Sequence, residues 1–403
     1  MTSEFYARNR ALLAKSLQGA VYVLSGYTAV QLTHDQAGPF VQEANFWYLT
    51  GIEQPDWLVI VDGSTHEEWL VKPQIDEVHE IFDGSLDAVR ASEISGIKKV
   101  VTHDEGVAVL RKLAKKHSIV HTIENPPYSD HFNFTLNPAI SANKKILERT
   151  FASVVDCQKE LAKLRAIKQP EEIKAIQKAI NLTIDGFGTV KQALGSAKYE
   201  YDLEAEFSYH FKRNGGADHA YDPIIATGKN ACTLHYIDNK SKLQARQFVL
   251  MDVGARVEGY AADITRTYIK GEPTKRQRDI HQAVEAAHQD IISLLEPELP
   301  VEEYMRRVDA RMKEALKDLG LLKDDNDTEV YRTYFPHAVS HGLGVDVHDS
   351  LGGARFFEPG MVLTVEPGIY IPEEGIGVRI EDDILITPTG HRNMSAKLST
   401  SYV

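Results

Sequence analysis

The sequence lacks the features that would place the protein in an oxidising compartment or in a membrane. Only two cysteines, Cys157 and Cys232, occur among its 403 residues, too few for a disulfide framework. No run approaches the ~18 consecutive apolar residues that a membrane-spanning helix requires. The N-terminus, MTSEFYARNRALLAKSLQGA, has neither the apolar core nor the cleavage site of a signal peptide. We therefore expect a cytoplasmic protein without a membrane partner.

Clustered positive charge is also missing. The formal net charge is −13, and no basic run or patch stands out against it, so we expect no binding to nucleic acid. Short-period repeats and low-complexity tracts are absent as well. The hydrophobic content of 43% and charged content of 26% are ordinary for a globular protein. A chain of this length can form two domains with substantial cores.

The first part of the chain predicts an α/β domain. Residues 20–125 alternate between helical runs (VAVLRKLAKKH) and strand-like runs: AVYVLSG, FWYLTG, WLVIVDG, EEWLVKP and KKVVTHD. Residues 125–143 are rich in Pro, Asn, Ser and Phe, which predicts a loop or an interdomain segment. Helical periodicity follows over 144–168. We place the domains at residues 1–160 and 161–403.

The second part predicts an α+β domain. Pro170 suits the first turn of a helix, and Glu171 and Glu172 suit its N-terminus. Further helices are expected near residues 275–296 and 300–319. Strands and helices are grouped there rather than strictly alternating, which favours α+β over α/β.

Four carboxylates in this part lie in aliphatic, strand-like stretches. Asp252, Asp263, Glu366 and Glu381 occur in FVLMDVG, YAADITRTYI, MVLTVEPGIYI and GVRIEDDILI. A buried carboxylate is costly unless something positive compensates it. A surface sheet with one solvent-exposed face would explain any one of these stretches, but this explanation would have to hold independently for all four. With His341 these carboxylates would balance two divalent cations, which predicts a two-metal hydrolytic site.

Three histidines fall close together in HAVSHGLGVDVHD. His337 and His341 have the spacing of a helical metal pair, but Gly342 and Gly344 argue against a long helix, and no HExxH glutamate is present. A single histidine in such a segment is more often a core or surface residue. Because three occur together with His348, we interpret one as a ligand and two as polar groups around a reacting carbonyl.

The segment CTLHY gives weaker indications. His235 taken alone predicts nothing. Cys232 would suit a thiol nucleophile, although a small buried cysteine is the commoner interpretation.

Taken together, MDVGA, ADITRT, HAVSHGLGVDVHD, VEPGIY and RIEDD resemble the metallopeptidases of the pita-bread fold (family M24), which include methionine aminopeptidase, prolidase and aminopeptidase P. The segment NFWYLTG resembles the N-terminal domain of aminopeptidase P, which methionine aminopeptidases lack. The resemblance covers nearly the whole chain. It implies an α/β N-terminal domain that shapes the substrate end of the cleft and mediates oligomerisation, followed by an α+β pita-bread catalytic domain.

The resemblance also implies the metal ligands. Matched position by position, these are Asp252, Asp263, His341, Glu366 and Glu381. Asp263 and Glu381 would bridge the two ions, and Glu366 would also carry a proton during catalysis. An oxygen-rich ligand set favours Mn²⁺, with Co²⁺, Zn²⁺ or Fe²⁺ as alternatives.

Five further residues match positions around the family's reacting groups. His337 and His348 would contact the substrate or stabilise the tetrahedral intermediate, and His235 would contact the substrate. Arg379 would support catalysis from the same strand face as Glu381, and Tyr370 would lie beside the substrate.

The sequence departs from the aminopeptidase P pattern at two places in the first domain. The segment EIFDG lacks the usual tryptophan, and FVQEAN lacks an arginine. Both positions bear on peptide length and on subunit contacts, so a homodimer and a homotetramer both remain open.

The activity that the resemblance implies is release of the N-terminal residue from peptides with proline at the second position. One alternative is an Xaa-Pro dipeptidase (prolidase) with the same site. Another is a pita-bread protein that only binds, as in relatives that have lost the ligands.

Overall fold

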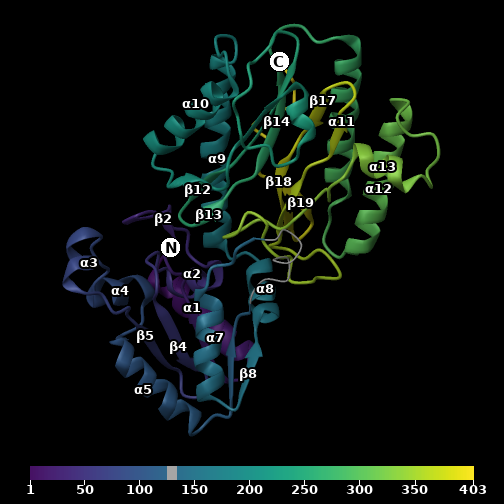
Figure 1. Ribbon diagram of the computed structural model, residues 1–403. Helices are drawn as coiled ribbons and strands as arrows, with labels where there is room; N and C mark the ends of the chain where they lie inside the picture. The colour runs from purple at the N-terminus through teal and green to yellow at the C-terminus, as the bar shows by residue number, and fades with distance from the viewer. Residues whose placement is uncertain (125–133) are drawn as a thin grey trace. The chain divides into compact units, whose positions relative to one another are not determined.

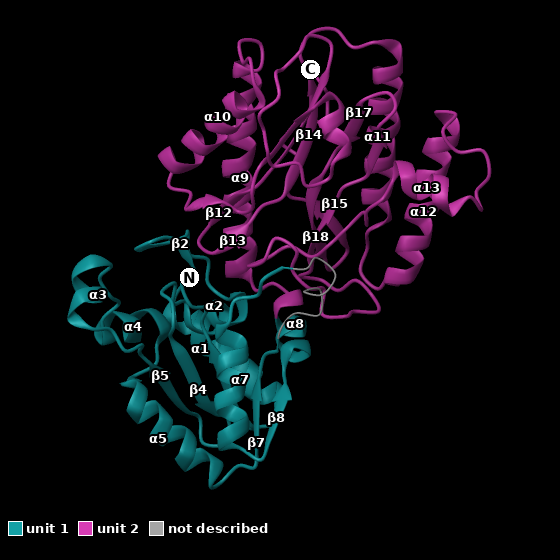
Figure 2. Ribbon diagram, viewed as in Figure 1, with its two compact units in different colours: residues 1–164 teal, residues 165–403 magenta. Residues whose placement is uncertain are grey.

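The computed structural model describes residues 1–124 and 134–403 and divides into two compact units, Met1–Leu164 and Arg165–Val403 (Figure 2). The expected domain boundary, after residue 160, falls inside helix α8 (Gln158–Ala166). The boundary between the two units, after Leu164, falls inside the same helix. Of the loop expected over 125–143, residues 125–133 lie outside the described residues, and a helix begins at Ala139.

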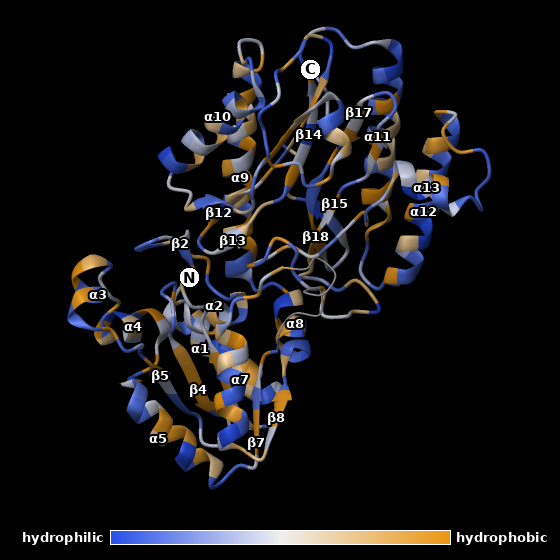
Figure 3. Ribbon diagram, viewed as in Figure 1, coloured by the Kyte–Doolittle hydropathy of each residue, from blue (hydrophilic) through white to orange (hydrophobic). Residues whose placement is uncertain are grey.

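Unit 1 is built on a six-stranded mixed sheet in the order β6-β5-β4-β1-β7-β8 (Figure 1). Strands β1 and β4 pair antiparallel, whereas β7 and β8 pair in parallel. Figure 3 shows β4 hydrophobic along its length, as expected for a strand inside a covered sheet. The strands are β1 (Val21–Ser25), β4 (Leu58–Asp62), β5 (Glu67–Val71), β6 (Lys99–Val101), β7 (Ile119–Thr122) and β8 (Ser153–Asp156), with a separate hairpin β2 (Gln31–Thr33) and β3 (Gln36–Ala37).

The helices of unit 1 cover this sheet. A capping box formed by Thr102 and Glu105 begins α5, whose Leu110 and Leu113 enter the core with Leu147 of α7. The helical pattern expected over 144–168 is interrupted by β8, so that prediction was wrong in part. The helices are α1 (Ser3–Ser16), α2 (Ala44–Thr50), α3 (Glu77–Phe82), α4 (Ala88–Ser95), α5 (His103–Ala114) and α7 (Ala139–Thr150).

The prediction of a strand at FWYLTG was wrong, because this segment forms helix α2. The carboxylate of Glu43 accepts a hydrogen bond from the amide of Phe46, and Gly51 ends the helix with a left-handed φ of 70°. Every residue from Phe46 to Thr50 is buried. A uniformly apolar run has no alternation, so periodicity could not distinguish a strand from a buried helix.

Unit 2 contains the longest helix of the structure's described part, α9 (Pro170–Ala193). Its predicted start at Pro170 is confirmed, and Glu172 accepts a hydrogen bond from the amide of Gln169 just before it. The other helices are α10 (Glu200–Arg213), the 3₁₀ helix η1 (Gly228–Cys232), α11 (Lys275–Leu294), α12 (Val301–Asp318) and α13 (Thr328–Tyr334).

The strands of unit 2 form small antiparallel sheets, in the orders β10-β11-β14, β9-β12-β13, β15-β18-β19 and β16-β17. Grouped strands and helices agree with the predicted α+β class. The strands are β9 (Asp218–His219), β10 (Ile224–Thr227), β11 (Phe248–Val253), β12 (Ala255–Val257), β13 (Tyr260–Ala261), β14 (Ile264–Ile269), β15 (Val362–Val365), β16 (Gly368–Ile371), β17 (Ile376–Arg379), β18 (Asp382–Thr387) and β19 (Gly390–Asn393).

The core of unit 2 lies between these strands and helices α11 and α12. Val284 of α11 and Met312 of α12 pack in one cluster with Val378 and Ile384 of β17 and β18. Figure 1 shows α11 running alongside β17. The opposite side chains of β17, including Arg379, are thereby directed away from this core. In the described part of the chain, every helix is too short or too polar to cross a bilayer.

Candidate metal centre

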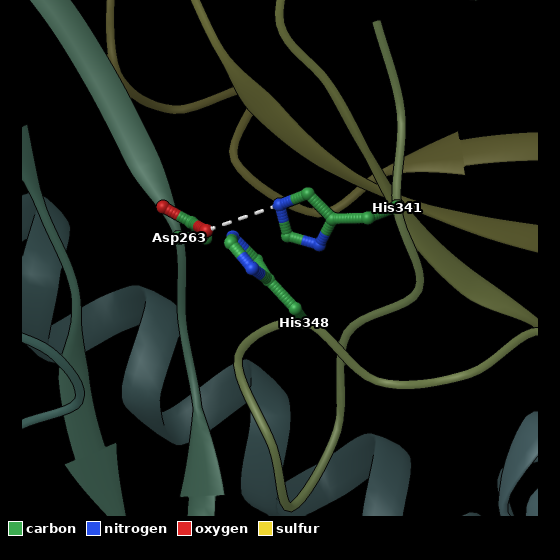
Figure 4. A group of neighbouring side chains, drawn as sticks. All are labelled: Asp263, His341 and His348. Atoms are coloured by element: carbon green, nitrogen blue, oxygen red, sulfur yellow. Dashed lines mark ion pairs between the residues drawn. The ribbon is translucent and has the colours of Figure 1, made fainter. Parts of the chain in front are cut away.

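The five predicted ligands come together from separate segments of unit 2. Asp252 lies in β11, whereas Asp263, Glu366 and Glu381 lie between one strand and the next, and His341 follows α13. Their oxygen and nitrogen atoms form overlapping groups, each within 4.8 Å: Asp252, Asp263 and Glu381; His341, Glu366 and Glu381; Asp263, His341 and His348. Figure 4 shows the last group, with the two histidine rings beside Asp263.

Strand breaks bring three of the carboxylates to the centre. The sequence predicted all four inside strands, but only Asp252 is in one. Pro367, which has no amide hydrogen, follows Glu366 and separates β15 from β16. The predicted continuous strand over 378–384 is likewise broken at Ile380 and Glu381. The amide of Glu381 donates instead to the carbonyl of Thr265 (3.0 Å), which joins this break to β14.

The backbone decides which nitrogen of His341 faces the carboxylates. Nδ1 lies 2.9 Å from the carbonyl oxygen of Gly342, which only accepts, so Nδ1 carries a hydrogen. Nε2 is 3.5 Å from Asp263 and 3.4 Å from Glu366. Burial opposes a charged ring, but these two carboxylates raise the pKa of His341 to about 9. The site thus attracts a cation at Nε2, where a metal ion would replace the proton.

The carboxylates carry more negative charge than the surrounding groups balance. Burial, reinforced by repulsion from Asp263, raises the pKa of Glu381 well above its usual range, and burial raises that of Glu366 to about 7. The hydroxyl of Tyr221 lies 2.5 Å from Asp252 and 2.6 Å from Asp263, yet it has one proton for both. Divalent cations fit this oxygen-rich donor set.

Arg379, Tyr370 and His337 form a chain of hydrogen bonds beside the carboxylates. Arg379 contacts Asp252 (2.5 Å) and donates to the Tyr370 hydroxyl (2.8 Å), which lies 2.8 Å from Nε2 of His337. Nδ1 of His337 lies 2.8 Å from the carbonyl of Ala338, so Nδ1 carries the hydrogen and Tyr370 donates to Nε2. Burial lowers the pKa of His337 to about 3, so the ring is neutral at pH 7.

The other two predicted substrate residues lie near the centre and are exposed. The ring of His348 is 4.3 Å from that of His341. Partial desolvation, then the positive charges of His341 and His235, lower the pKa of His348 to about 4. His235 lies in the loop that follows η1. The structure therefore gathers all the predicted site residues in one region of unit 2.

Two residues of the centre were absent from the predicted site. Thr265 donates to Glu381 (2.6 Å) and accepts from Nε of Arg379 (3.2 Å). It therefore links the candidate ligand Glu381 to the guanidinium of Arg379. Thr265 lies two residues after Asp263 in the same strand-like stretch, so strand alternation, which sets such residues on one face, is the signal that could have found it. Tyr221 precedes β10 in an irregular segment, where no periodic pattern marks it.

Comparison with known proteins assigns the family. Residues 174–388, more than half of the chain, match Metallopeptidase family M24. The chain belongs to family M24. Residues 6–121 of this M24 chain match a second family, Aminopeptidase P, N-terminal domain. The predicted architecture, an aminopeptidase P N-terminal domain followed by a pita-bread domain, is confirmed.

Relatives of this M24 chain match over nearly its full length. The Xaa-Pro aminopeptidase of Escherichia coli (strain K12) is 32% identical and covers 98% of this chain and 95% of its own. Human Xaa-Pro aminopeptidase 3 is 31% identical, covering 96% of this chain and 81% of its own. A putative aminopeptidase P from Bacillus anthracis superposes with a TM-score of 0.89 at 33% identity, covering 100% and 97% of the two chains. Aminopeptidase P from E. coli with the inhibitor Pro-Leu gives 0.87 at 30% identity, with the same coverage. Membership of M24 implies divalent metal ions.

Proposed function

We propose that this M24 chain is a metal-dependent Xaa-Pro aminopeptidase, which releases the N-terminal residue from peptides with proline at the second position. The observation that carries the proposal is the convergence of four carboxylates and His341 at one centre. The chain of this protein also matches Xaa-Pro aminopeptidases through both domains, as expected if both domains serve that activity.

We propose two ions per chain, with manganese as the native metal. Asp252, Asp263, His341, Glu366 and Glu381 would hold them, because their ligand atoms belong to overlapping groups that each lie within 4.8 Å. Bound there, the ions would supply Lewis-acid activation of water and of the scissile carbonyl. The imbalance of negative charge among these buried carboxylates supports a dinuclear site.

The neighbouring side chains would handle protons and substrate. Glu366, whose pKa lies near 7 through burial, is suited to accept and release a proton at neutral pH. Arg379 orients Tyr370, and Tyr370 orients the neutral ring of His337 toward the same centre. The exposed rings of His348 and His235 would contact the peptide.

The proposal predicts hydrolysis that depends on a divalent ion. Protein treated with EDTA should lose activity toward Xaa-Pro-Xaa tripeptides and regain it with Mn²⁺, because the carboxylates of the centre outnumber the cationic side chains beside them. The measurement is release of the first residue, with Xaa-Ala-Xaa as the control peptide.

Equal cleavage of the alanine peptide, or full activity without metal, would refute this proposal. Cleavage of an Xaa-Pro dipeptide alone would identify the dipeptidase instead. Metal binding without any hydrolysis would favour a binding protein.

We also propose that the N-terminal domain, which we predict from the sequence to span residues 1–160, shapes the substrate end of the cleft and mediates assembly into a homodimer or homotetramer. Helix α3 supports self-association because it has no buried residue and exposes Val78, Ile81 and Phe82. Light scattering of the purified protein would measure the assembly. A cytoplasmic location remains our prediction from the sequence, and cell fractionation would test it.

A further inference from the structure

One buried carboxylate outside the metal centre closes the loop that carries His235. Glu200 is the first residue of α10, and its side chain is fully buried. Oε1 accepts hydrogen bonds from the amide of Thr227 (2.8 Å) and the side chain of Asn230 (3.0 Å). Oε2 accepts from the hydroxyl of Tyr236 (2.8 Å) and the amide of Ser241 (2.8 Å). The four donors span residues 227–241, so one side chain joins both ends of this loop and two points within it.

The loop lies beside the site, because its residues Cys232, Leu234 and Tyr236 pack against a cluster that includes Tyr370, and its base is fixed. Asn239 forms a second attachment: its Oδ1 accepts from the amide of Ile225 (3.0 Å), and its Nδ2 donates to the carbonyl of Pro223 (2.8 Å). Between these two attachments, the side chain of His235 is exposed. The contacts that hold residues 227–241 closed therefore set where His235 stands relative to Tyr370 and the site.

We propose that Glu200 is a positioning residue for substrate binding, which acts through His235. The inference deepens the proposed peptidase function and rests on it. Glu200 contacts neither the candidate ligands nor the substrate histidines, and it fixes the loop that presents one of them. Its loss should weaken binding of the peptide while the metal centre stays intact.

Only a carboxylate satisfies this arrangement, because every partner donates. Glutamine has one accepting oxygen and one NH₂ group. In either orientation its NH₂ faces a backbone amide, Thr227 on one side or Ser241 on the other. A backbone N–H cannot reverse its role, whereas the hydroxyl of Tyr236 can. Glu200→Gln must therefore release one end of the loop, although the side chain keeps its size.

The first experiment compares Glu200→Gln with Glu206→Gln, the same substitution at a half-buried position of the same helix. We expect KM for an Xaa-Pro-Xaa peptide to rise roughly tenfold or more in Glu200→Gln, as for a lost hydrogen bond to a charged group, with metal content unchanged and kcat little altered. Glu206→Gln should match the wild type. In a His235→Ala background, Glu200→Gln should have little further effect on KM, because the histidine that it positions is gone.

The second experiment uses no activity. Hydrogen exchange of the metal-free protein should accelerate at residues 227–241 in Glu200→Gln and not in Glu206→Gln. If Glu200→Gln does not fold, Tyr236→Phe combined with Asn230→Ala removes two of the four donors and should raise both exchange and KM to a smaller extent.

These experiments separate the two proposals. A wild type that cleaves no Xaa-Pro peptide, with faster exchange in Glu200→Gln, would refute the peptidase function and leave the loop closure standing. An active wild type whose Glu200→Gln variant keeps its exchange and KM would overturn this inference. Equal effects of Glu200→Gln in the presence and absence of His235 would overturn it too, because Glu200 would then act through something else.

Discussion

At His341 a single carbonyl oxygen determines what the side chain can bind. Because Gly342 holds the hydrogen of Nδ1, the lone pair of Nε2 is available on the side of Asp263 and Glu366. His337 differs, since its two nitrogens are engaged by Ala338 and Tyr370. Two histidines four residues apart in the sequence thus differ in their hydrogen-bond partners, and these partners favour His341 as the candidate ligand.

We predict that the three histidines of this segment separate by metal content. His341→Ala should bind metal more weakly, because it removes a ligand nitrogen that faces two carboxylates. His348→Ala should keep the metal and lose turnover by ~10²–10³-fold, as for removal of a hydrogen-bond donor at a reacting carbonyl. His337→Ala should also keep the metal and lose turnover, because Tyr370 loses the acceptor that orients its hydroxyl. The measurement is metal per chain alongside kcat for each purified variant. Loss of metal from His337→Ala, with retention in His341→Ala, would reverse the assignment.

At the scale of single elements, the sequence predicted the strands better than their ends. The alternation around Asp252 matches β11, whose pairing with β14 sets Asp252 opposite Thr265. The breaks that carry Glu366 and Glu381 were not predicted, because a carboxylate beside a strand end has the same apolar neighbours as one inside a strand. The candidate ligands could therefore be proposed from local sequence, but the convergence of their side chains depends on tertiary pairing.

Helix α9 offers a test of packing that does not touch the site. A side chain at Gly188 would meet open space, whereas a Cβ at Gly186 would lie 3.0 Å from Phe211 and 3.1 Å from Phe207, both fully buried in α10. Gly188→Ala should stabilise the protein by about 0.5–1 kcal/mol through helix propensity. Gly186→Ala should destabilise it by about 1–3 kcal/mol, because the two rings cannot move aside freely.

Chemical denaturation of the two variants would check this prediction, since they carry the same substitution two residues apart in one helix. A stabilised Gly186→Ala would mean that α9 and α10 pack less tightly than the structure shows.

For the molecule as a whole, the metal-free centre couples stability to pH. Glu366 and Glu381 have raised pKa values when folded, so folding becomes less favourable as pH rises toward those values. His341 acts in the same direction: the stability that its raised pKa provides is complete below about 6.5 and is lost as pH rises through about 9. Burial lowers the pKa of His337 and His348, which costs stability only below about 6.5.

Between about pH 6.5 and 9, therefore, the raised pKa values of Glu366, Glu381 and His341 all make the folded state less stable as pH rises. We expect Tm of the metal-free protein to fall across this range, and the fall to be smaller in protein loaded with Mn²⁺, because bound cations replace the protons. Calorimetry of both forms would measure it. A metal-free Tm that rises over the same range would contradict the electrostatic description of the centre.

The distribution of the proposed ligands along the chain also bears on how the protein would acquire its ions. They extend from Asp252 to Glu381, and strand pairings between distant segments unite them. Contacts between distant residues form late in folding, so an incompletely folded chain offers an ion only scattered carboxylates. Ion capture then follows assembly of the sheets. We therefore expect strand pairing, rather than the supply of ions, to limit the rate at which refolding protein becomes metal-loaded, and each captured ion to draw the folding equilibrium toward the native chain.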